Sequence, residues 1–332
     1  MKKFVGILLI ALLFNSCNDG DITVETIDFE AVDALTCGNF LVYKIKGNEA
    51  LIIGLPQDTN LFTNDPTLLN TPRTVEIGTA GVTMLYRAYS NAATIAGICA
   101  SPPPISPVAI LEWTAVTGTI QVTTTPVYGE PDPTNGQSKI TRYRHAIIVR
   151  GLRFAKPDGT DQIYPSFTFG NYFTNPTNAL NFDFDAEDVR LCATTNTLYN
   201  ARNSGPESLI IQNFDTANLL STNNLGVAKT ALIGDTANKL VYRYFATNLQ
   251  TGTNESYFCN NITGATTIAE EWIGLNGVSG VSGIIEVTTV ANPNGAGFLH
   301  TIRLKGVTFK KQNSTSTFYY GNDILYGELI TE

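Results

Sequence analysis

The chain carries the segment HAIIVRGLRF at residues 145–154 and a close copy of it, HTIRLKGVTF, at residues 300–309. In both segments apolar and polar residues alternate with a period of two, which is the pattern of a β-strand with one buried face. The apolar positions change parity after a glycine, Gly151 in the first segment and Gly306 in the second. A glycine at which the buried face changes predicts a β-bulge. We therefore expect one bent strand to occur twice.

The repetition covers most of the chain. Tyr86-Arg87 returns as Tyr242-Arg243, Glu112-Trp113 returns as Glu271-Trp272, and DFEA at 28–31 returns as DFDA at 183–186. The order is kept, and each copy is larger than the 20–50 residues of a solenoid repeat. About 150 residues are enough for an independent core. The sequence therefore predicts two tandem domains, copy 1 at residues 22–173 and copy 2 at residues 180–332.

Short runs rich in β-branched and aromatic residues dominate both copies. Examples are Phe40 to Ile45, Leu51 to Gly54, Val82 to Tyr89, Tyr164 to Phe169, and the matching pair 119–123 and 284–288. Turn-forming residues separate them, few stretches show a helical period, and Asp215 to Leu220 is expected to form a helical turn. This pattern predicts an all-β fold, in which each copy is an antiparallel β-sandwich or jelly-roll-like domain of eight or nine short strands.

The N-terminus has the composition of a secretory signal. Two lysines precede an apolar run from Phe4 to Phe14, and Asn15-Ser16-Cys17 follows. The run is shorter than the roughly 20 residues that cross a bilayer, so residues 1–16 are expected to be a cleaved signal peptide.

Ser16-Cys17, at this distance from the start, resembles the lipobox of bacterial lipoproteins. The resemblance implies that Cys17 becomes the first residue and carries a diacylglycerol thioether and, as a rule, an N-acyl chain. Acyl chains of this length give a stable membrane anchor. Residues 17–21 would then be the lipidated cysteine and an acidic tether, similar to those of outer-membrane and surface-exposed lipoproteins. A plain secretory signal is the alternative.

Charge excludes one class of partner. The whole chain has 21 basic and 29 acidic residues, and removal of Lys2 and Lys3 with the signal leaves 19 against 29, a net charge of −10. Such a protein is repelled by nucleic acid. We expect no nucleic-acid partner.

Cysteine positions predict two disulfides. Besides Cys17 the chain has Cys37 and Cys99 in copy 1 and Cys192 and Cys259 in copy 2. Four cysteines allow three pairings, and the duplication selects the two pairings within copies. An exported chain reaches an oxidising compartment in which such bonds persist. Free buried thiols are the alternative.

The two histidines, His145 and His300, occupy equivalent positions on a face that alternates with apolar residues. A histidine there acts either as a general base or as a buried, hydrogen-bonded structural group. Each stands alone in its copy, so a shared metal site is not expected. The apolar alternation favours the structural role.

Candidate ligand contacts are aromatic. Trp113 and Trp272 each follow a glutamate, which is the arrangement of a sugar platform when the ring is exposed. A tryptophan in the core with an outward glutamate explains the pattern equally well and is favoured. Tyr86 and Tyr242 are read in the same way, with the neighbouring arginines paired to acids.

No motif assigns catalysis. A serine-hydrolase elbow, a zinc-protease helix, a phosphate loop and a dinucleotide fingerprint are all absent from the sequence. The acidic alternation Asp183, Asp185, Glu187, with Asp28 and Glu30 in copy 1, suits a half-buried strand better than a Ca²⁺ site. We expect no metal and no cofactor.

The sequence thus favours a non-catalytic, lipid-anchored binding or scaffold protein on the surface or periplasmic face of an outer membrane. Its partner would be a glycan or an outer-membrane protein, since two copies on one chain raise effective affinity. The layout is similar to that of tandem β-sandwich lipoproteins that accompany glycan importers. A carbohydrate-active hydrolase using a carboxylate pair is the alternative.

Overall fold

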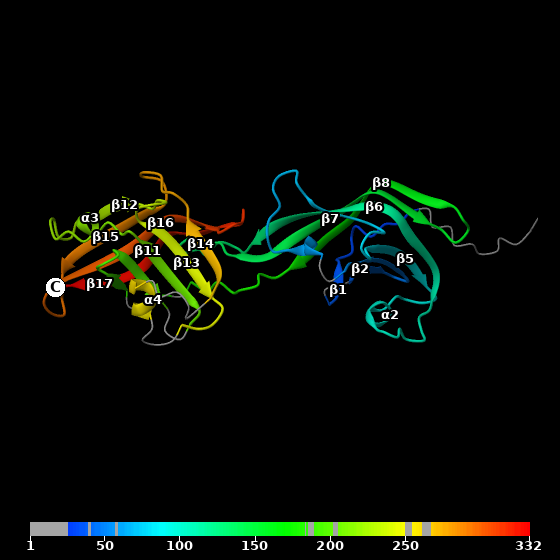
Figure 1. Cartoon of the computed structure of the whole chain (residues 1–332), viewed down its shortest axis with the longest axis horizontal. Helices are drawn as coiled ribbons and strands as arrows, with labels where there is room; N and C mark the ends of the chain where they lie inside the picture. Colours follow the sequence, from blue (N-terminus) through cyan, green and yellow to red (C-terminus); the bar gives the residue numbers. More distant parts are fainter. Residues whose placement is uncertain are drawn as a thin grey trace, which may run out of the picture.

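The computed structural model describes residues 26–38, 41–56, 59–182, 184, 189–201, 205–249, 254–260 and 267–332. The expected signal peptide, Cys17, the expected tether, and Asp183, Asp185 and Glu187 lie outside these residues. The predicted all-β class is confirmed, because the chain forms two antiparallel β-sheets, one from each copy. Figure 1 shows the two copies end to end, with the C-terminus at the far end of copy 2.

Copy 1 forms one eight-stranded sheet in the order β1-β2-β3-β5-β6-β7-β8, with β4 paired to β6. Its strands are β1 (Leu35–Cys37), β2 (Leu41–Lys46), β3 (Glu49–Gly54), β4 (Arg73–Glu76), β5 (Thr83–Tyr89), β6 (Ala109–Tyr128), β7 (Ile140–Ala155) and β8 (Asp161–Thr174). The short helices η1 (Asn60–Phe62) and α2 (Ile95–Cys99) lie in its connections.

Copy 2 forms a nine-stranded sheet in the order β12-β15-β16-β14-β13-β11-β10-β9, with β17 paired to β16. Its strands are β9 (Arg190–Cys192), β10 (Thr197–Ala201), β11 (Glu207–Gln212), β12 (Lys229–Leu232), β13 (Lys239–Phe245), β14 (Ile268–Gly274), β15 (Ile284–Ala291), β16 (Phe298–Lys311) and β17 (Thr317–Thr331). It also contains α3 (Thr216–Leu219), at the predicted helical turn, and α4 (Asn254–Asn260).

The two sheets have the same plan with one difference. The first half of β6 pairs with β5 and its second half with β4. In copy 2 these two halves are separate strands, since β14 pairs with β13 and β15 with β12. The expectation of short strands is therefore wrong for β6, which runs without interruption for 20 residues. A long strand that pairs with one neighbour in its first half and another in its second half lets the sheet fold over its own apolar face.

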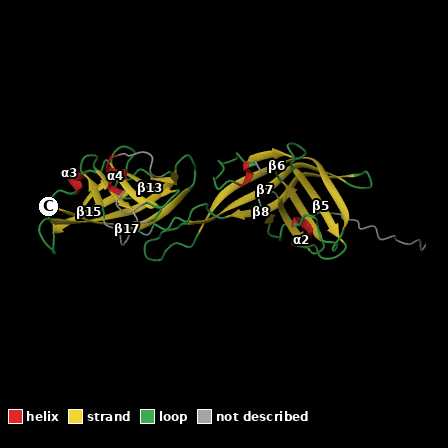
Figure 2. Ribbon diagram, turned by 60° about the horizontal axis from the view of Figure 1, so that its bottom comes forward, coloured by secondary structure: helices red, strands yellow, loops and turns green. Residues whose placement is uncertain are grey.

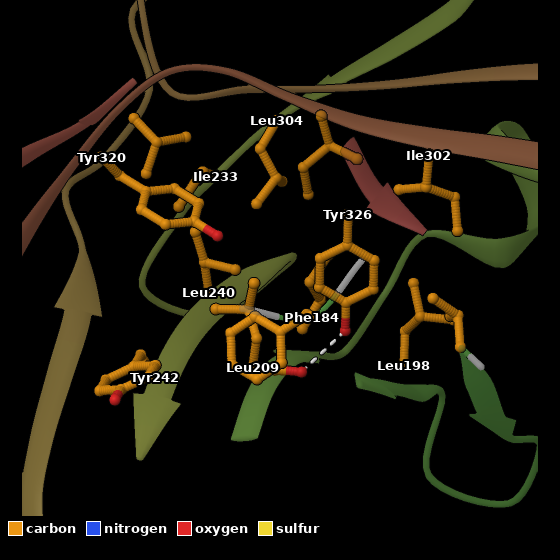
Figure 3. Close-up of a cluster of buried hydrophobic side chains, with 14 of the residues drawn as sticks. Phe184, Leu198, Leu209, Ile233, Leu240, Tyr242, Ile302, Leu304, Tyr320 and Tyr326 are labelled. Atoms are coloured by element: carbon orange, nitrogen blue, oxygen red, sulfur yellow. Dashed lines mark hydrogen bonds between the residues drawn. The ribbon is translucent and has the colours of Figure 1, made fainter. Parts of the chain in front are cut away.

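Each copy encloses its own core between the folded halves of its sheet. In copy 1 the core includes Ile53, Met84 and Val149, and in copy 2 it includes Leu209, Ile302 and Leu304. Figure 3 shows the core of copy 2, in which the hydroxyl of Tyr326 donates a 2.9 Å hydrogen bond to the carbonyl oxygen of Leu209. The buried tyrosine thereby satisfies its polar atom inside an apolar cluster.

The parity change at the two glycines is confirmed. Gly151 and Gly306 both have φ +59°, and the buried positions switch from Val149 to Leu152 and from Leu304 to Val307. At Gly151 the register between β6 and β7 shifts by one residue, which is a bulge. At Gly306 the partner of β16 changes from β15 to β14. Glycine adopts this left-handed backbone without the steric cost that a Cβ would bring.

Both predicted disulfides are present. Cys37 pairs with Cys99 and Cys192 with Cys259, with Cα–Cα distances of 5.5 Å and 5.2 Å. Each bond ties the first strand of a copy to the short helix that precedes the glutamate–tryptophan strand. Disulfides of this kind indicate an extracytoplasmic compartment. Within the described part of the chain, no helix has the length and apolar character needed to span a membrane.

The copies are joined by hydrogen bonds as well as by the linker. The amide of Ser138 donates to the carbonyl of Tyr319 (3.0 Å), and the amide of Asn322 donates to the carbonyl of Asn135 (2.6 Å). The hydroxyl of Tyr128 reaches the carbonyl of Thr317 at 2.7 Å. The β6–β7 hairpin of copy 1 therefore adds to the edge of β17 in copy 2, and Figure 2 shows this end-to-end contact from a second side.

Candidate ligand cavity at the junction of the two copies

The four aromatic side chains that the sequence singled out lie in the cores. Trp113 is 4% exposed and Trp272 is 1% exposed, while Tyr86 and Tyr242 have no exposed surface. A ligand on the outer surface cannot reach rings that are buried to this extent. The alternative of exposed sugar platforms is therefore wrong at these positions, and the favoured core position of the tryptophans is confirmed.

Each buried tyrosine has a glutamate partner that the sequence analysis missed. The hydroxyl of Tyr86 donates to Glu49 at the start of β3, and that of Tyr242 donates to Glu207 at the start of β11. Burial and the adjacent carboxylate raise the pKa of both tyrosines well above the usual range. The repeated sequence could have indicated these glutamates, because EALIIG at 49–54 returns as ESLIIQ at 207–212.

The outward residues of the same motifs form ion pairs. Arg87 pairs with Glu112 on the neighbouring strand, and Arg243 pairs with Glu271 at 2.6 Å. The prediction that these arginines are paired with acids is confirmed. Both pairs join opposite residues of adjacent strands, and a cross-strand pair of this kind supports the pairing of the tryptophan-bearing strand in each copy.

The histidines are structural, as the favoured interpretation held. His145 Nδ1 lies 2.9 Å from Thr124 Oγ1 and its Nε2 lies 2.8 Å from Thr174 Oγ1. His300 lies between Thr289 and Thr331 in the same way, at 2.8 Å and 2.9 Å. Neither ring is exposed. Burial, with nearby Arg73, lowers the pKa of His145 to about 4, so the ring is neutral at pH 7.

A cavity of about 360 Å³ lies where the two copies meet. Copy 1 contributes the start of β7, residues 139–141 and Tyr143. The linker contributes residues 176–182, and copy 2 contributes Glu270, Trp272, Lys311 and Phe318. The volume falls within the range of small-molecule sites, which occur preferentially at domain interfaces.

Glu270 is the carboxylate of this cavity, and both of its oxygens are engaged. Oε1 accepts hydrogen bonds from Trp272 Nε1 at 2.8 Å and faces Lys311 Nζ at 3.1 Å. Oε2 accepts from Asn178 Nδ2 of the linker at 2.8 Å. With 7% of its side chain exposed, Glu270 holds the linker against copy 2 and orients the indole.

The lining of the junction cavity contains both aromatic rings and polar atoms. Trp272 and Phe318 are in edge-to-face contact at 5.0 Å, and Phe182 lies 5.1 Å from Phe318. On the opposite side, Tyr143 directs its hydroxyl to Ser316 Oγ of copy 2 at 3.3 Å. An apolar floor with a few fixed polar groups is the composition of a site for a small ligand with both C–H faces and hydroxyl groups.

The cavity depends on differences between the copies. Lys156 lies over Trp113, with Nζ 4.8 Å from the ring centroid, as Lys311 lies over Trp272 at 5.8 Å. However, copy 1 has Leu111 where copy 2 has Glu270, and Trp113 lines no part of the junction cavity. The sequence identified Trp272 but gave no reason to separate it from Trp113.

A second, more open groove of about 810 Å³ adjoins the junction. It is formed by Asp65, Pro66 and Leu68 of copy 1 and by copy 2 residues that include Asp235, Asn276 and 310–315. Lys311 lines both hollows. The junction therefore offers the 360 Å³ cavity, which we call the chamber, and a wider groove beside it.

No three His, Cys, Asp or Glu side chains of the described residues gather closely enough to hold a metal ion. Comparison with protein-family models finds no match to the chain, and neither curated proteins nor solved structures provide one.

Proposed function

We propose that the chain is a non-catalytic outer-membrane lipoprotein, anchored through Cys17, that binds a glycan at the junction of its two copies. The observation that carries the binding part is the 360 Å³ junction cavity with its apolar lining and fixed hydrogen-bonding groups. The anchor rests on the lipobox-like Ser16-Cys17, and the two disulfides agree with an exported protein.

A sugar ring suits this chamber. Its C–H faces pack on apolar side chains, here Ile140, Pro176 and Leu180 of the lining, while its hydroxyls need fixed donors and acceptors. Asn178, Thr141 and Lys311 supply such groups from three different segments. The adjoining groove is lined by asparagine, glutamine, serine and threonine side chains, which suits further sugar units outside the chamber.

A hydrolytic role receives less support from the cavity. Retaining and inverting glycosidases use two carboxyl groups on opposite sides of the scissile bond. Among the residues that line the chamber, Glu270 is the one carboxylate, and Trp272, Asn178 and Lys311 already occupy its oxygens. An outer-membrane protein partner is the remaining alternative, and it would contact the surface rather than the chamber.

A glycan array with the soluble chain from residue 22 tests the binding site. Ala179 is exposed on the linker and lines the chamber, so Ala179→Trp fills the space without disturbing a core. Asn175→Trp places the same ring on the same linker, at an exposed position that does not line the chamber. We expect the array signal to be lost in the first variant and kept in the second.

Two lysines give a second matched pair. Lys311→Met removes a cation from the chamber wall, whereas Lys156→Met removes the equivalent cation over Trp113. Binding that weakens only in Lys311→Met supports the junction site. Equal binding by both variants and by Ala179→Trp, or silence of the native chain across the array, contradicts it.

The anchor has its own test. The native chain is expected to fractionate with outer membranes and to yield an N-terminal peptide bearing acyl chains by mass spectrometry. Cys17→Ala should release it, because a single lipid-bearing residue carries the attachment. Unchanged fractionation of Cys17→Ala would rule out the anchor and leave the glycan site untouched.

A further inference from the structure

One exposed surface of copy 1 is formed by a segment whose sequence copy 2 does not repeat. From the residues after α2 into the start of β6 the chain reads SPPPISPVAI at residues 101–110, and Ile105 is 94% exposed. Ile95, Val108 and Ile110 are also more than half exposed, at 56%, 51% and 53%. We call these four side chains and the segment 95–110 the apolar loop. Exposed aliphatic patches on soluble domains mark interaction surfaces.

The apolar loop also lacks charge. No Lys, Arg, Asp or Glu occurs between Arg87 and Glu112, although these residues make up 15% of the chain. In copy 2 the corresponding stretch, between Arg243 and Glu271, contains two glutamates, and the segment after Cys259 has no proline. The difference is therefore a property of copy 1 and not of the repeated fold.

The loop lies at the end of copy 1 that faces away from copy 2. The last residue of β6, Tyr128, contacts Thr317 of copy 2, whereas the loop joins β6 at its first residue, Ala109. Figure 1 accordingly shows α2 in the half of the molecule opposite the C-terminus.

The first described residues lie at the same end. The amide of Ile27 donates to the hydroxyl of Tyr164 near the start of β8, and Tyr164 pairs with Leu152 near the end of β7. The opposite end of β7 lines the junction cavity. Cys17 precedes Ile27 by 10 residues, which an extended chain spans in at most about 36 Å.

From these observations we propose that the apolar loop inserts into the lipid surface to which Cys17 is anchored, so that copy 1 rests on the bilayer and the junction site projects from it. This inference rests on the lipid anchor of the proposed function. The net charge of −10 repels the protein from anionic headgroups, so the face nearest the bilayer must be free of carboxylates. The apolar loop meets that requirement, and aliphatic side chains gain from transfer into the acyl boundary.

Tryptophan substitution and brominated lipids provide the test. The full acylated chain, carrying Ile105→Trp, is reconstituted in vesicles of phosphatidylethanolamine and phosphatidylglycerol, with and without bromine on the acyl chains. Val281→Trp is the matched control, because Val281 is 74% exposed on a loop of copy 2. Native Trp113 and Trp272 are buried and give the same background in both variants.

The expected result is that bromine quenches most of the added emission of Ile105→Trp and leaves that of Val281→Trp unchanged. Equal quenching of the two variants, or none in either, overturns the proposal. A blue shift of Ile105→Trp that appears only in native outer membranes assigns the loop to a protein partner and also overturns it. Flotation of the native chain with the vesicles reports the anchor separately, so failure of the anchor and failure of the loop give different results.

Discussion

The hydroxyl of Tyr242 donates a 2.6 Å hydrogen bond to Oε1 of Glu207, and neither residue has any exposed surface. The amide of Asn181 in the linker donates to the same oxygen at 2.8 Å. Tyr86 and Glu49 form the equivalent pair in copy 1, but Glu49 is partly exposed. The same tyrosine–glutamate hydrogen bond is thus fully buried in copy 2 and accessible to water in copy 1.

The difference in burial predicts a difference in stability. Tyr242→Phe removes one donor from a carboxyl group that water cannot reach, and we expect a loss of about 1.5–3 kcal/mol in the free energy of unfolding. Tyr86→Phe should cost less, because water replaces the donor at Glu49. Urea unfolding of the two variants checks this. Equal losses would show that the burial of Glu207 does not set the cost of the missing donor.

Acid should destabilise the protein through the histidines. The pKa of His145 is about 4 in the folded chain against about 6.5 in an unfolded one. A depressed histidine pKa contributes stability above pH 6.5, and this is lost as the pH falls toward 4, because only the unfolded state binds the proton. We expect a loss of about 2–3 kcal/mol over that window from this group. His300, whose pKa is also lowered, acts in the same direction.

The melting temperature between pH 7 and pH 5 measures this effect, since most carboxylates remain ionised in that range. His145→Gln should be less stable than the native chain at pH 7, because it loses the contacts to Thr124 and Thr174. It should also show a flatter pH dependence. A native-like slope in this variant would assign the acid sensitivity to other groups.

The sequence predicted the features that recur in both copies. The period-two alternation around His145 and His300, the parity change at the two glycines and the paired cysteines each appear twice, and repetition separates such constraints from accidental patterns. Such features can be predicted from short stretches of sequence. A period of two indicates a strand, and a glycine at which the buried face changes indicates a bulge.

Features that exist once could not be predicted in this way. The junction cavity combines Tyr143, the linker and Phe318, which are distant in sequence and meet only through the contact between copies. Likewise, β6 is continuous while its counterpart is interrupted by residues 275–283. Glu270 replaces Leu111 at one position of an otherwise repeated strand, and only the structure shows that this position faces the linker.

Each disulfide should contribute substantially to stability. The bonded cysteines are 62 residues apart in copy 1 and 67 in copy 2. Loops of this length predict about 4 kcal/mol per bond from the entropy of the unfolded chain. We expect Cys37→Ser with Cys99→Ser to lower the free energy of unfolding by about that amount, and the copy 2 double variant to do the same. Denaturant unfolding of each double variant without reductant is the measurement. A loss below about 1 kcal/mol in either would show that strain or residual structure offsets the entropy.

The two glycines at which the buried face changes, Gly151 and Gly306, offer a comparison in which backbone strain is equal and packing differs. Both have φ +59°, so an alanine at either position incurs the cost of a left-handed backbone, about 1–2 kcal/mol. A Cβ at Gly151 would meet nothing within 4 Å, whereas at Gly306 it would lie 3.0 Å from Ser282 Cα and 3.2 Å from the carbonyl oxygen of Val281.

Gly306→Ala should therefore destabilise the protein more than Gly151→Ala, because the backbone of the loop before β15 must move as well. Asparagine tolerates the left-handed region better than alanine, so Gly151→Asn should recover part of the loss at the open site and Gly306→Asn should not. Urea unfolding of the four variants measures the two contributions. If Gly151→Ala and Gly306→Ala lose the same free energy, the contact with Ser282 yields without cost and backbone conformation alone requires glycine at both positions.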